Sequence, residues 1–210
     1  MSTLSGKKIA EMVRDGKLKI DPFDHQMIQP ASYDLRLGPK ILASALPSEK
    51  CGTVIELTKS KPSFLINFGQ MVGVLSLEKI QLPLDICGRF GIRSSFARRG
   101  LNAFGGLQLD PGWRGRLNMN FLNVGPEPIT LTLHDPLFSV EFQRLEEPAG
   151  SEYNGPYQDQ NDFTADQYDY ILKARDTSLA EFPVLKDQVS RFSSQMDELL
   201  EGLREGRFTE

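Results

Sequence analysis

The sequence contains few of the residues that form disulfide frameworks or zinc sites. Only two cysteines, Cys51 and Cys87, and two histidines, His25 and His134, occur in 210 residues. Neither cysteine belongs to a C-x-x-C pair, so their spacing argues against a structural zinc site and predicts no protein-held metal. We expect both thiols to be reduced, as is usual for proteins of a reducing compartment.

Long apolar runs and an excess of positive charge are also lacking. No apolar stretch approaches the ~20 residues that a membrane-spanning helix requires, and the N-terminal segment MSTLSGKKIAEMV lacks the apolar centre of a signal peptide. The formal net charge is −4, which disfavours general binding to nucleic acid or anionic membranes. We therefore expect a cytoplasmic protein with no nucleic-acid and no membrane partner.

Turn-forming residues, by contrast, are abundant. Eighteen glycines and thirteen prolines separate short segments rich in β-branched and aromatic residues, at the spacing typical of a β-sandwich or β-barrel. The predicted strands are YDLRLG, ending at Gly38-Pro39, and KILAS, TVIEL, SFLINF, MVGVLSLEKIQLP, RLNMNFLNVG, PITLTL and PLFSVEFQRL. The sequence thus predicts an all-β fold.

Helical signals occur near the two ends of the chain. Ser5 can cap a helix in which Ile9, Met12 and Val13 follow an i, i+3, i+4 spacing before Gly16 ends it. The segment around residues 150–170 is polar and aromatic without a clear period, which predicts a loop or a flexible closing segment.

Residues 187–208 form an amphipathic pattern. One stripe contains Val189, Phe192, Met196, Leu199, Leu200 and Leu203. Packing against its own domain or a neighbouring subunit is the simpler interpretation, and recruitment of a partner for this C-terminal helix is the alternative.

The strongest local signal for an anionic ligand is GIRSSFARRGL, residues 91–101. It combines Arg93, Arg98 and Arg99 with two serines at the start of a helical turn. Free backbone N–H groups, hydroxyls and guanidinium groups all suit phosphate oxygens. A solvated basic patch is the structural alternative.

Five segments in a fixed order strengthen this hypothesis. They are QPASYDLRLG (29–38), RSSFARRGL (93–101), LDPGWRG (109–115), NVGPEPITL (123–131) and YQDQ (157–160). Together they resemble the dCTP deaminase branch of the dCTP deaminase/dUTPase superfamily. The resemblance implies a dUTPase-like, distorted, jelly-roll-like β-barrel over residues 1–172, with an N-terminal helix and a C-terminal helical extension over 173–210. It also implies a homotrimer, a deoxynucleoside triphosphate ligand, and Mg²⁺ bound through the nucleotide phosphates.

The resemblance also implies roles for individual residues. The substrate-binding positions are Arg93, Ser94, Ser95 and Arg98 for phosphate, Asp110 for the deoxyribose, Asn118, Met119 and Asn120 for the base, and Tyr157 and Gln160 in the closing segment. The catalytic positions are Asp110 and Asn120. In isolation, Asp110 in DPGW could simply form a turn, and Trp113 is better explained as a core residue.

Asn120 departs from the family pattern, because deaminases carry their essential glutamate there. An amide cannot shuttle protons near neutral pH, so deaminase activity is not expected to survive intact. Strand alternation places Asn118 and Asn120 on one face and Leu117, Met119 and Phe121 on the other. No carboxylate within the strand can substitute.

Two further departures concern the phosphates and the base. Pro156 occupies the position of a family lysine, and NAFGGLQL, residues 102–109, is shorter than the family pattern.

Three interpretations remain open. They are a pyrimidine deoxynucleoside triphosphate (dCTP/dUTP) hydrolase of the dCTP deaminase type, a dUTP diphosphatase in which Asp110 activates water, and a non-catalytic nucleotide-binding or regulatory homologue.

Overall fold

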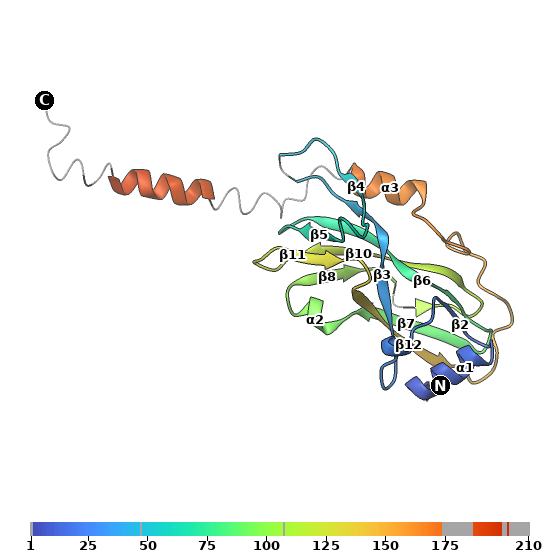
Figure 1. Ribbon diagram of the computed structural model, residues 1–210. Coiled ribbons are helices and arrows are strands. Elements are labelled where there is room, and N and C mark those ends of the chain that lie inside the picture. Colours follow the sequence, from blue (N-terminus) through green and yellow to red (C-terminus); the bar gives the residue numbers. More distant parts are fainter. Residues whose placement is uncertain (1, 47, 107, 174–186, 199–200, 202–210) are drawn as a thin grey trace, which may run out of the picture.

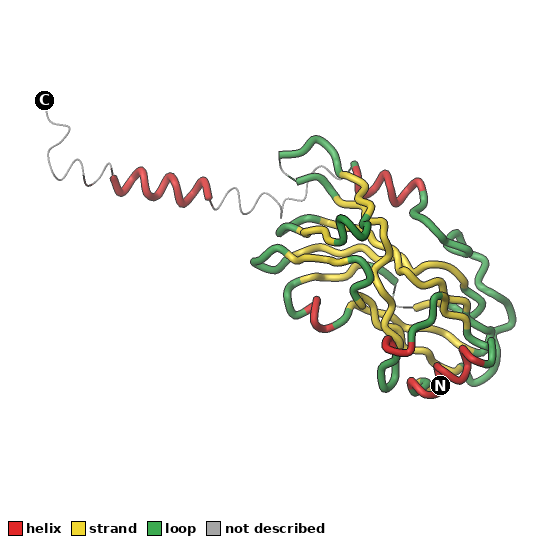
Figure 2. The backbone as a smooth tube through the Cα atoms, in the orientation of Figure 1, coloured by secondary structure: helices red, strands yellow, loops and turns green. Residues whose placement is uncertain are grey.

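The computed structural model describes residues 2–46, 48–106, 108–173, 187–198 and 201. Figure 1 shows a mostly β body, and Figure 2 shows short helices at its periphery. The strands are β1 Ser2–Thr3, β2 Lys19–Asp21, β3 Tyr33–Ala43, β4 Thr53–Glu56, β5 Ser63–Ile66, β6 Met71–Gln81, β7 Ile86–Ile92, β8 Leu101–Phe104, β9 Gln108–Leu109, β10 Arg114–Asn123, β11 Ile129–Thr132 and β12 Pro136–Arg144. The helices with bounds are α1 Gly6–Arg14, the 3₁₀ turn His25–Met27, α2 Ser94–Ala97 and α3 Ala165–Leu172.

Most strands belong to one curled sheet. Its order is β8-β10-β6-β3-β12-β7-β9, and β1, β2 and β4 pair with β12, β6 and β3 respectively. Strands β11 and β5 form a separate pair. A core of buried aliphatic and aromatic side chains fills the inside of the curl, and Tyr33, Phe121, Phe138 and Phe142 are its largest fully buried members. The all-β fold class is therefore confirmed.

Strand β10 shows the predicted alternation of faces. Leu117, Met119 and Phe121 are each 3% exposed or less, while Asn118 and Asn120 between them are only partly buried. The strand lies between β6 and β8 and is antiparallel to both. Its apolar face thus fixes the direction in which the two asparagines point.

The prediction that a strand ends at Gly38-Pro39 is wrong. Strand β3 continues through both residues to Ala43. Pro39 is exposed, and the pairing of β3 with β6 shifts register between Leu37 and Ile41. A proline lacks the N–H that a regular ladder requires, and such an irregularity is a place where a strand tolerates it.

The N-terminal helix is confirmed with its predicted cap. In α1, the Ser5 side chain accepts a hydrogen bond from the Lys8 backbone N–H at 3.3 Å. Gly16 follows the helix with φ of +70°, a conformation that favours glycine. Ile9 and Met12 are buried, so the predicted apolar face is the packed one.

The closing segment was predicted as a loop, but it contains helix α3. Thr164 and Gln167 form a capping box at its start, a signal visible in the sequence as TADQ. Phe163 and Ile171 pack with Leu42 and Leu75 in a second apolar cluster. This cluster holds α3 against β3 and β6.

The C-terminal stripe lies only partly within the described residues. Residues 187–198 are helical, and Val189, Phe192 and Met196 are 60%, 70% and 56% exposed. The other predicted members, Leu199, Leu200 and Leu203, fall outside the described ranges. No helix in the described part of the chain is long and apolar enough to cross a membrane.

Candidate functional site

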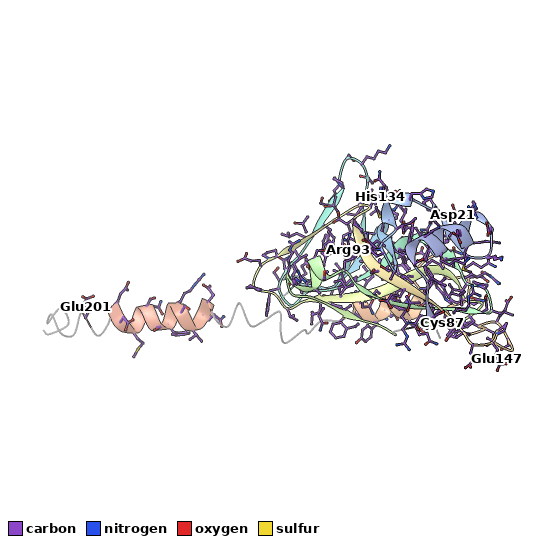
Figure 3. All side chains as sticks on the ribbon, turned by 90° about the horizontal axis from the view of Figure 1, so that it is seen from below. Asp21, Cys87, Arg93, His134, Glu147 and Glu201 are labelled. Carbon is purple, nitrogen blue, oxygen red and sulfur yellow. The ribbon has the colours of Figure 1, made fainter. Side chains whose placement is uncertain are left out.

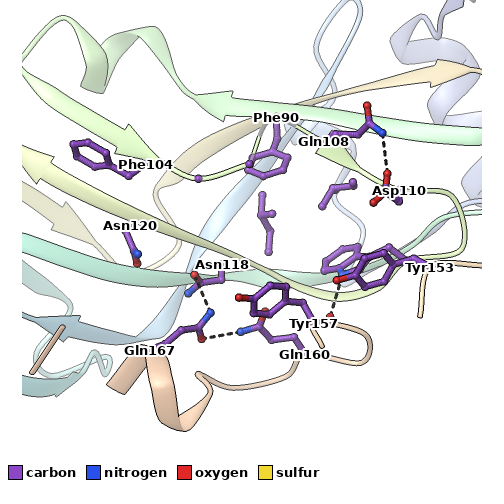
Figure 4. Close-up of a pocket in the computed structure, with 15 residues that line it drawn as sticks. Phe90, Phe104, Gln108, Asp110, Asn118, Asn120, Tyr153, Tyr157, Gln160 and Gln167 are labelled. Atoms are coloured by element: carbon purple, nitrogen blue, oxygen red, sulfur yellow. Dashed lines mark hydrogen bonds between the residues drawn. The ribbon is translucent and has the colours of Figure 1, made fainter. Parts of the chain in front are cut away.

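A pocket of about 400 Å³ opens between β8, β9, β10 and the closing segment (Figure 4). Five predicted site residues line it, namely Asp110, Asn118, Asn120, Tyr157 and Gln160. The structure therefore brings together residues that lie up to 50 positions apart in the sequence. The remaining lining residues are Phe90, Phe104, Gly105, Gly106, Gln108, Leu109, Trp113, Leu117, Tyr153 and Gln167.

Asp110 reaches the pocket because it begins a tight turn. The Trp113 N–H donates to the Asp110 carbonyl at 3.1 Å, and Pro111 and Gly112, the latter with φ of +79°, suit the central positions of a type II turn. The Gln108 side-chain amide donates to the Asp110 carboxylate at 2.8 Å. Asp110 is thus both the turn former and a pocket-lining carboxylate.

A chain of side-chain amides joins β10 to the closing segment. The Gln160 amide donates to Gln167 Oε1 at 3.0 Å, and the Gln167 amide donates to Asn118 Oδ1 at 3.4 Å. Asn118 Nδ2 in turn donates to the Val74 carbonyl at 3.3 Å. Gln167 was not predicted as a site residue, although its place in the TADQ capping signal could have identified it.

Asn120 differs from these amides because its oxygen has no partner. Among the described residues, its Oδ1 is the one buried side-chain nitrogen or oxygen atom without a hydrogen bond. A methyl group built on Gly73 would lie 3.0 Å from this oxygen, 2.5 Å from Ile171 Cδ1 and 3.4 Å from Phe163 Cε1. The oxygen, Ile171 and Phe163 therefore all border the space beside Gly73.

We predict that Gly73→Ala lowers the free energy of unfolding by about 1–3 kcal/mol, because the added methyl overpacks the contact between β6 and α3. Urea unfolding followed by circular dichroism measures this change. Gly91→Ala is the matched control, since a methyl there would have no atom within 4 Å. Equal stability of the two variants would contradict the prediction.

Aromatic side chains form much of the remaining wall. Trp113 is 5% exposed and belongs to the core, as predicted, yet it also borders the pocket. Its indole N–H donates to the Tyr157 carbonyl at 3.0 Å, which ties the closing segment to the turn after Asp110. Phe104 and Tyr157 are 45% and 47% exposed, so both present ring surface on which a planar ligand can stack.

The arginine-rich segment lies outside this pocket. Arg93 follows β7, and Figure 3 shows it well separated from Cys87 near the start of that strand. Its guanidinium is 3.3 Å from the buried Asp34 carboxylate. Burial raises the pKa of that carboxyl, and the Arg93 charge opposes the rise. Ser94, Ser95 and Arg98 on and after α2 are exposed.

The structure therefore separates the predicted phosphate-binding residues from the predicted residues that line the pocket. The first group is Arg93, Ser94, Ser95 and Arg98, none of which lines the pocket. Met119 belongs to a strand that was expected to line the base pocket partly through backbone groups, and its side chain lies in the core, on the face that strand alternation predicted. Among the described lining residues there is no lysine or arginine. A triphosphate in this pocket would need cations from another source.

The donor set in the pocket is sparse for a metal ion. Asp110 is the one carboxylate among the described lining residues, and the described chain contains no group of three or more His, Cys, Asp or Glu side chains suited to a metal. A Mg²⁺ ion often takes few protein ligands and several waters and phosphate oxygens. The residues present fit an ion carried in on a nucleotide.

The chain is similar in sequence to known dCTP deaminases. The chain is 36% identical to a dCTP deaminase of Thermococcus gammatolerans over 154 residues, which are 70% of this chain and 90% of that protein. It is 37% identical to a dCTP deaminase of Pyrococcus abyssi over 145 residues, covering 68% of this chain and 86% of the other.

A solved structure shares the fold. The crystal structure of a 2′-deoxycytidine 5′-triphosphate deaminase from Agrobacterium tumefaciens superimposes with a TM-score of 0.56 at 22% identity. The match covers 68% of this chain and 47% of that one, so this chain spans about half the length of that protein. The family profile described as dCTP deaminase-like matches residues 3–145. The chain belongs to the dCTP deaminase-like family.

Proposed function

We propose that this protein is a pyrimidine deoxynucleoside triphosphate hydrolase acting on dUTP or dCTP, in which Asp110 activates the attacking water. The observation that carries the proposal is the position of Asp110, the one carboxylate among the described residues of the pocket. A carboxylate that positions and deprotonates water supplies the base for pyrophosphate release of the diphosphatase type, and the phosphates need cations in addition.

Deamination requires different chemistry, at the cytosine ring of the nucleotide. Water attack at C4 of cytosine requires a group that takes a proton and returns it to the ring and the leaving ammonia. The motif resemblance assigns that group to position 120, which is Asn120 here, and an amide cannot perform this transfer near neutral pH. Its Oδ1 is buried without a hydrogen-bond partner, a setting in which an ionised carboxylate would be costly.

Binding of a triphosphate requires cations, and the described residues that line the pocket of a single chain include no lysine or arginine. We infer that Arg93, Ser94, Ser95 and Arg98 of a neighbouring copy supply them, in a homotrimer with sites between subunits. These side chains are at or near the surface in one copy, and guanidinium groups bind phosphate with two parallel hydrogen bonds. A Mg²⁺ ion bound through the phosphates would neutralise part of their charge. We assign the catalytic domain to residues 1–172 and an extension to 173–210.

A second candidate is a nucleotide-binding protein without catalysis. The observation in its favour is the uncharged end of the pocket, where Asn118, Asn120, Gln160 and Gln167 are all amides. Such a pocket can bind a base through hydrogen bonds and perform no proton transfer.

One assay separates these functions. The purified chain is incubated with Mg²⁺ and dCTP, dUTP or dTTP, and ammonia and pyrophosphate are measured separately. We expect pyrophosphate without ammonia. Ammonia from dCTP would contradict the proposal, and nucleotide-dependent thermal stabilisation without either product would support the binding protein instead.

A further inference from the structure

We infer that Asn120 makes the pocket selective for a pyrimidine with a keto group at C4, as in uracil or thymine, over one with an amino group, as in cytosine. The inference rests on the proposed function, because it assumes that a pyrimidine nucleotide enters this pocket. It adds the feature of the base that the protein reads and the atom that reads it.

The first step is the orientation of the Asn120 amide. Its Oδ1 is the buried atom. It borders the space beside Gly73, which Phe163 and Ile171 also border. Turning the amide over would place Nδ2 there and leave two N–H donors without acceptors in the same apolar surroundings. An unpaired buried group costs about 1–3 kcal/mol, and the orientation in the structure, with Oδ1 buried, leaves the N–H donors outside the buried position, where a ligand can pair them.

The second step is which atom of the Asn120 amide faces the pocket. Nδ2 is not among the buried unpartnered atoms and donates no hydrogen bond within the described residues, while Asn120 lines the pocket. The neighbouring Asn118 is different, because both ends of its amide are engaged by Val74 and Gln167. Asn120 therefore offers the pocket a free hydrogen-bond donor.

The third step concerns which atom of the base meets this donor. Asp110 and Asn120 lie toward opposite ends of the pocket in Figure 4. With the sugar and phosphates at Asp110, the base extends toward Asn120. C4 lies across the ring from N1, which carries the sugar, so the C4 substituent reaches farthest in that direction.

The consequence follows from hydrogen-bond polarity. A C4 keto oxygen accepts from Asn120 Nδ2, whereas a C4 amino group brings a second donor against it. A site that hydrogen-bonds one group rejects an analogue of opposite polarity, because a polar atom is then left unpaired. The amide of Asn120, which cannot transfer protons, thus sets a preference for the base that has no amino group at C4.

The test compares affinities of two non-hydrolysable ligands, α,β-imido-dUTP and α,β-imido-dCTP, measured by calorimetry with Mg²⁺ at pH 8. We expect the full chain to bind the uracil compound about tenfold more tightly, the ratio that corresponds to one hydrogen bond of about 1.4 kcal/mol. Asn120→Asp, which has the same shape but only acceptors, should reverse the preference. Asn120→Ala should bring the two affinities within about twofold of each other.

The control is Asn118→Ala, which removes a neighbouring amide without changing the donor at position 120. It should weaken both ligands alike and leave their ratio unchanged. Equal affinities in the unaltered protein, or a ratio that survives Asn120→Ala, would overturn the inference while leaving the proposed function intact. Failure of the unaltered protein to bind either compound would overturn both. Thermal unfolding confirms that each variant is folded, and Asn120→Ala gives the comparison if Asn120→Asp does not fold.

Discussion

Replacement of Asp110 by asparagine is expected to lower pyrophosphate release from dUTP by about 100- to 10,000-fold, the usual contribution of general acid–base catalysis. The asparagine amide keeps the shape of the carboxylate. It can still contact Gln108, whose side-chain amide donates to the Asp110 carboxylate at 2.8 Å in the unaltered protein. It cannot take a proton from water. The turn itself should persist, because it depends on the Asp110 carbonyl, Pro111 and Gly112. Steady-state kinetics with a coupled pyrophosphate assay measures the change.

The form of the loss distinguishes catalysis from binding. If Asp110 activates water, kcat falls and the affinity for α,β-imido-dUTP changes little. A rise in KM with kcat unchanged would mean that Asp110 only holds the sugar, which would contradict the proposed mechanism. Asp135→Asn serves as the control, because Asp135 accepts from the Thr132 backbone in a turn outside the pocket and should leave kcat unchanged.

Replacement of Arg36 by methionine is expected to lower the free energy of unfolding by about 3–5 kcal/mol, because it leaves a buried carboxylate without its cation. Arg36 Nε donates to Glu78 Oε1 at 2.6 Å and its backbone N–H donates to Oε2 at 2.8 Å. Glu78 is fully buried and the Arg36 side chain is 16% exposed. Urea unfolding at pH 8 measures the loss.

The sign of the pH dependence follows from Glu78. Burial raises the pKa of its carboxyl above 4.5, although Arg36 opposes the rise. Above pH 4.5 the folded state therefore holds this proton where the unfolded chain has released it, so stability falls as pH increases through that interval. Without Arg36 the carboxyl pKa rises further, and the cost of Arg36→Met should be smaller at pH 5 than at pH 8.

Two further variants complete this test. Arg14→Met removes a cation from an exposed pair with Asp15, in which the side chains are 73% and 44% exposed, and should change stability by less than about 1 kcal/mol. The double variant Arg36→Met/Glu78→Met should recover most of the lost stability, since it removes the buried charge as well. A cost that is the same at both pH values would contradict this account.

The sequence predicted those parts of the fold that depend on local patterns. Alternating side chains identified β10, and Ser5 with Gly16 bounded α1, because caps and turns act over a few residues. The continuation of β3 through Pro39 was missed, since a shift in the register with β6 accommodates the proline, and that pairing involves residues more than thirty positions away.

The residues of the candidate site also divide into those that the sequence identified and those that only the folded structure brings together. The family resemblance assigned Asp110, Asn118, Asn120, Tyr157 and Gln160 to the site, and all five line the pocket. Gln108, Gln167 and the exposed Phe104 were missed, because only the meeting of β8, β9 and α3 around β10 makes them neighbours. The sequence contained a local signal for one of these, the capping pair Thr164 and Gln167.

The attachment of the closing segment has a consequence for the order in which the molecule is made. The Arg116 N–H donates to the Gln160 carbonyl, and Gly52 N–H donates to the Leu172 carbonyl, so residues 160–172 are joined to strands synthesised much earlier. A chain still emerging from the ribosome can therefore pair the strands of its sheet before Tyr157, Gln160 and Gln167 are present to complete the pocket wall.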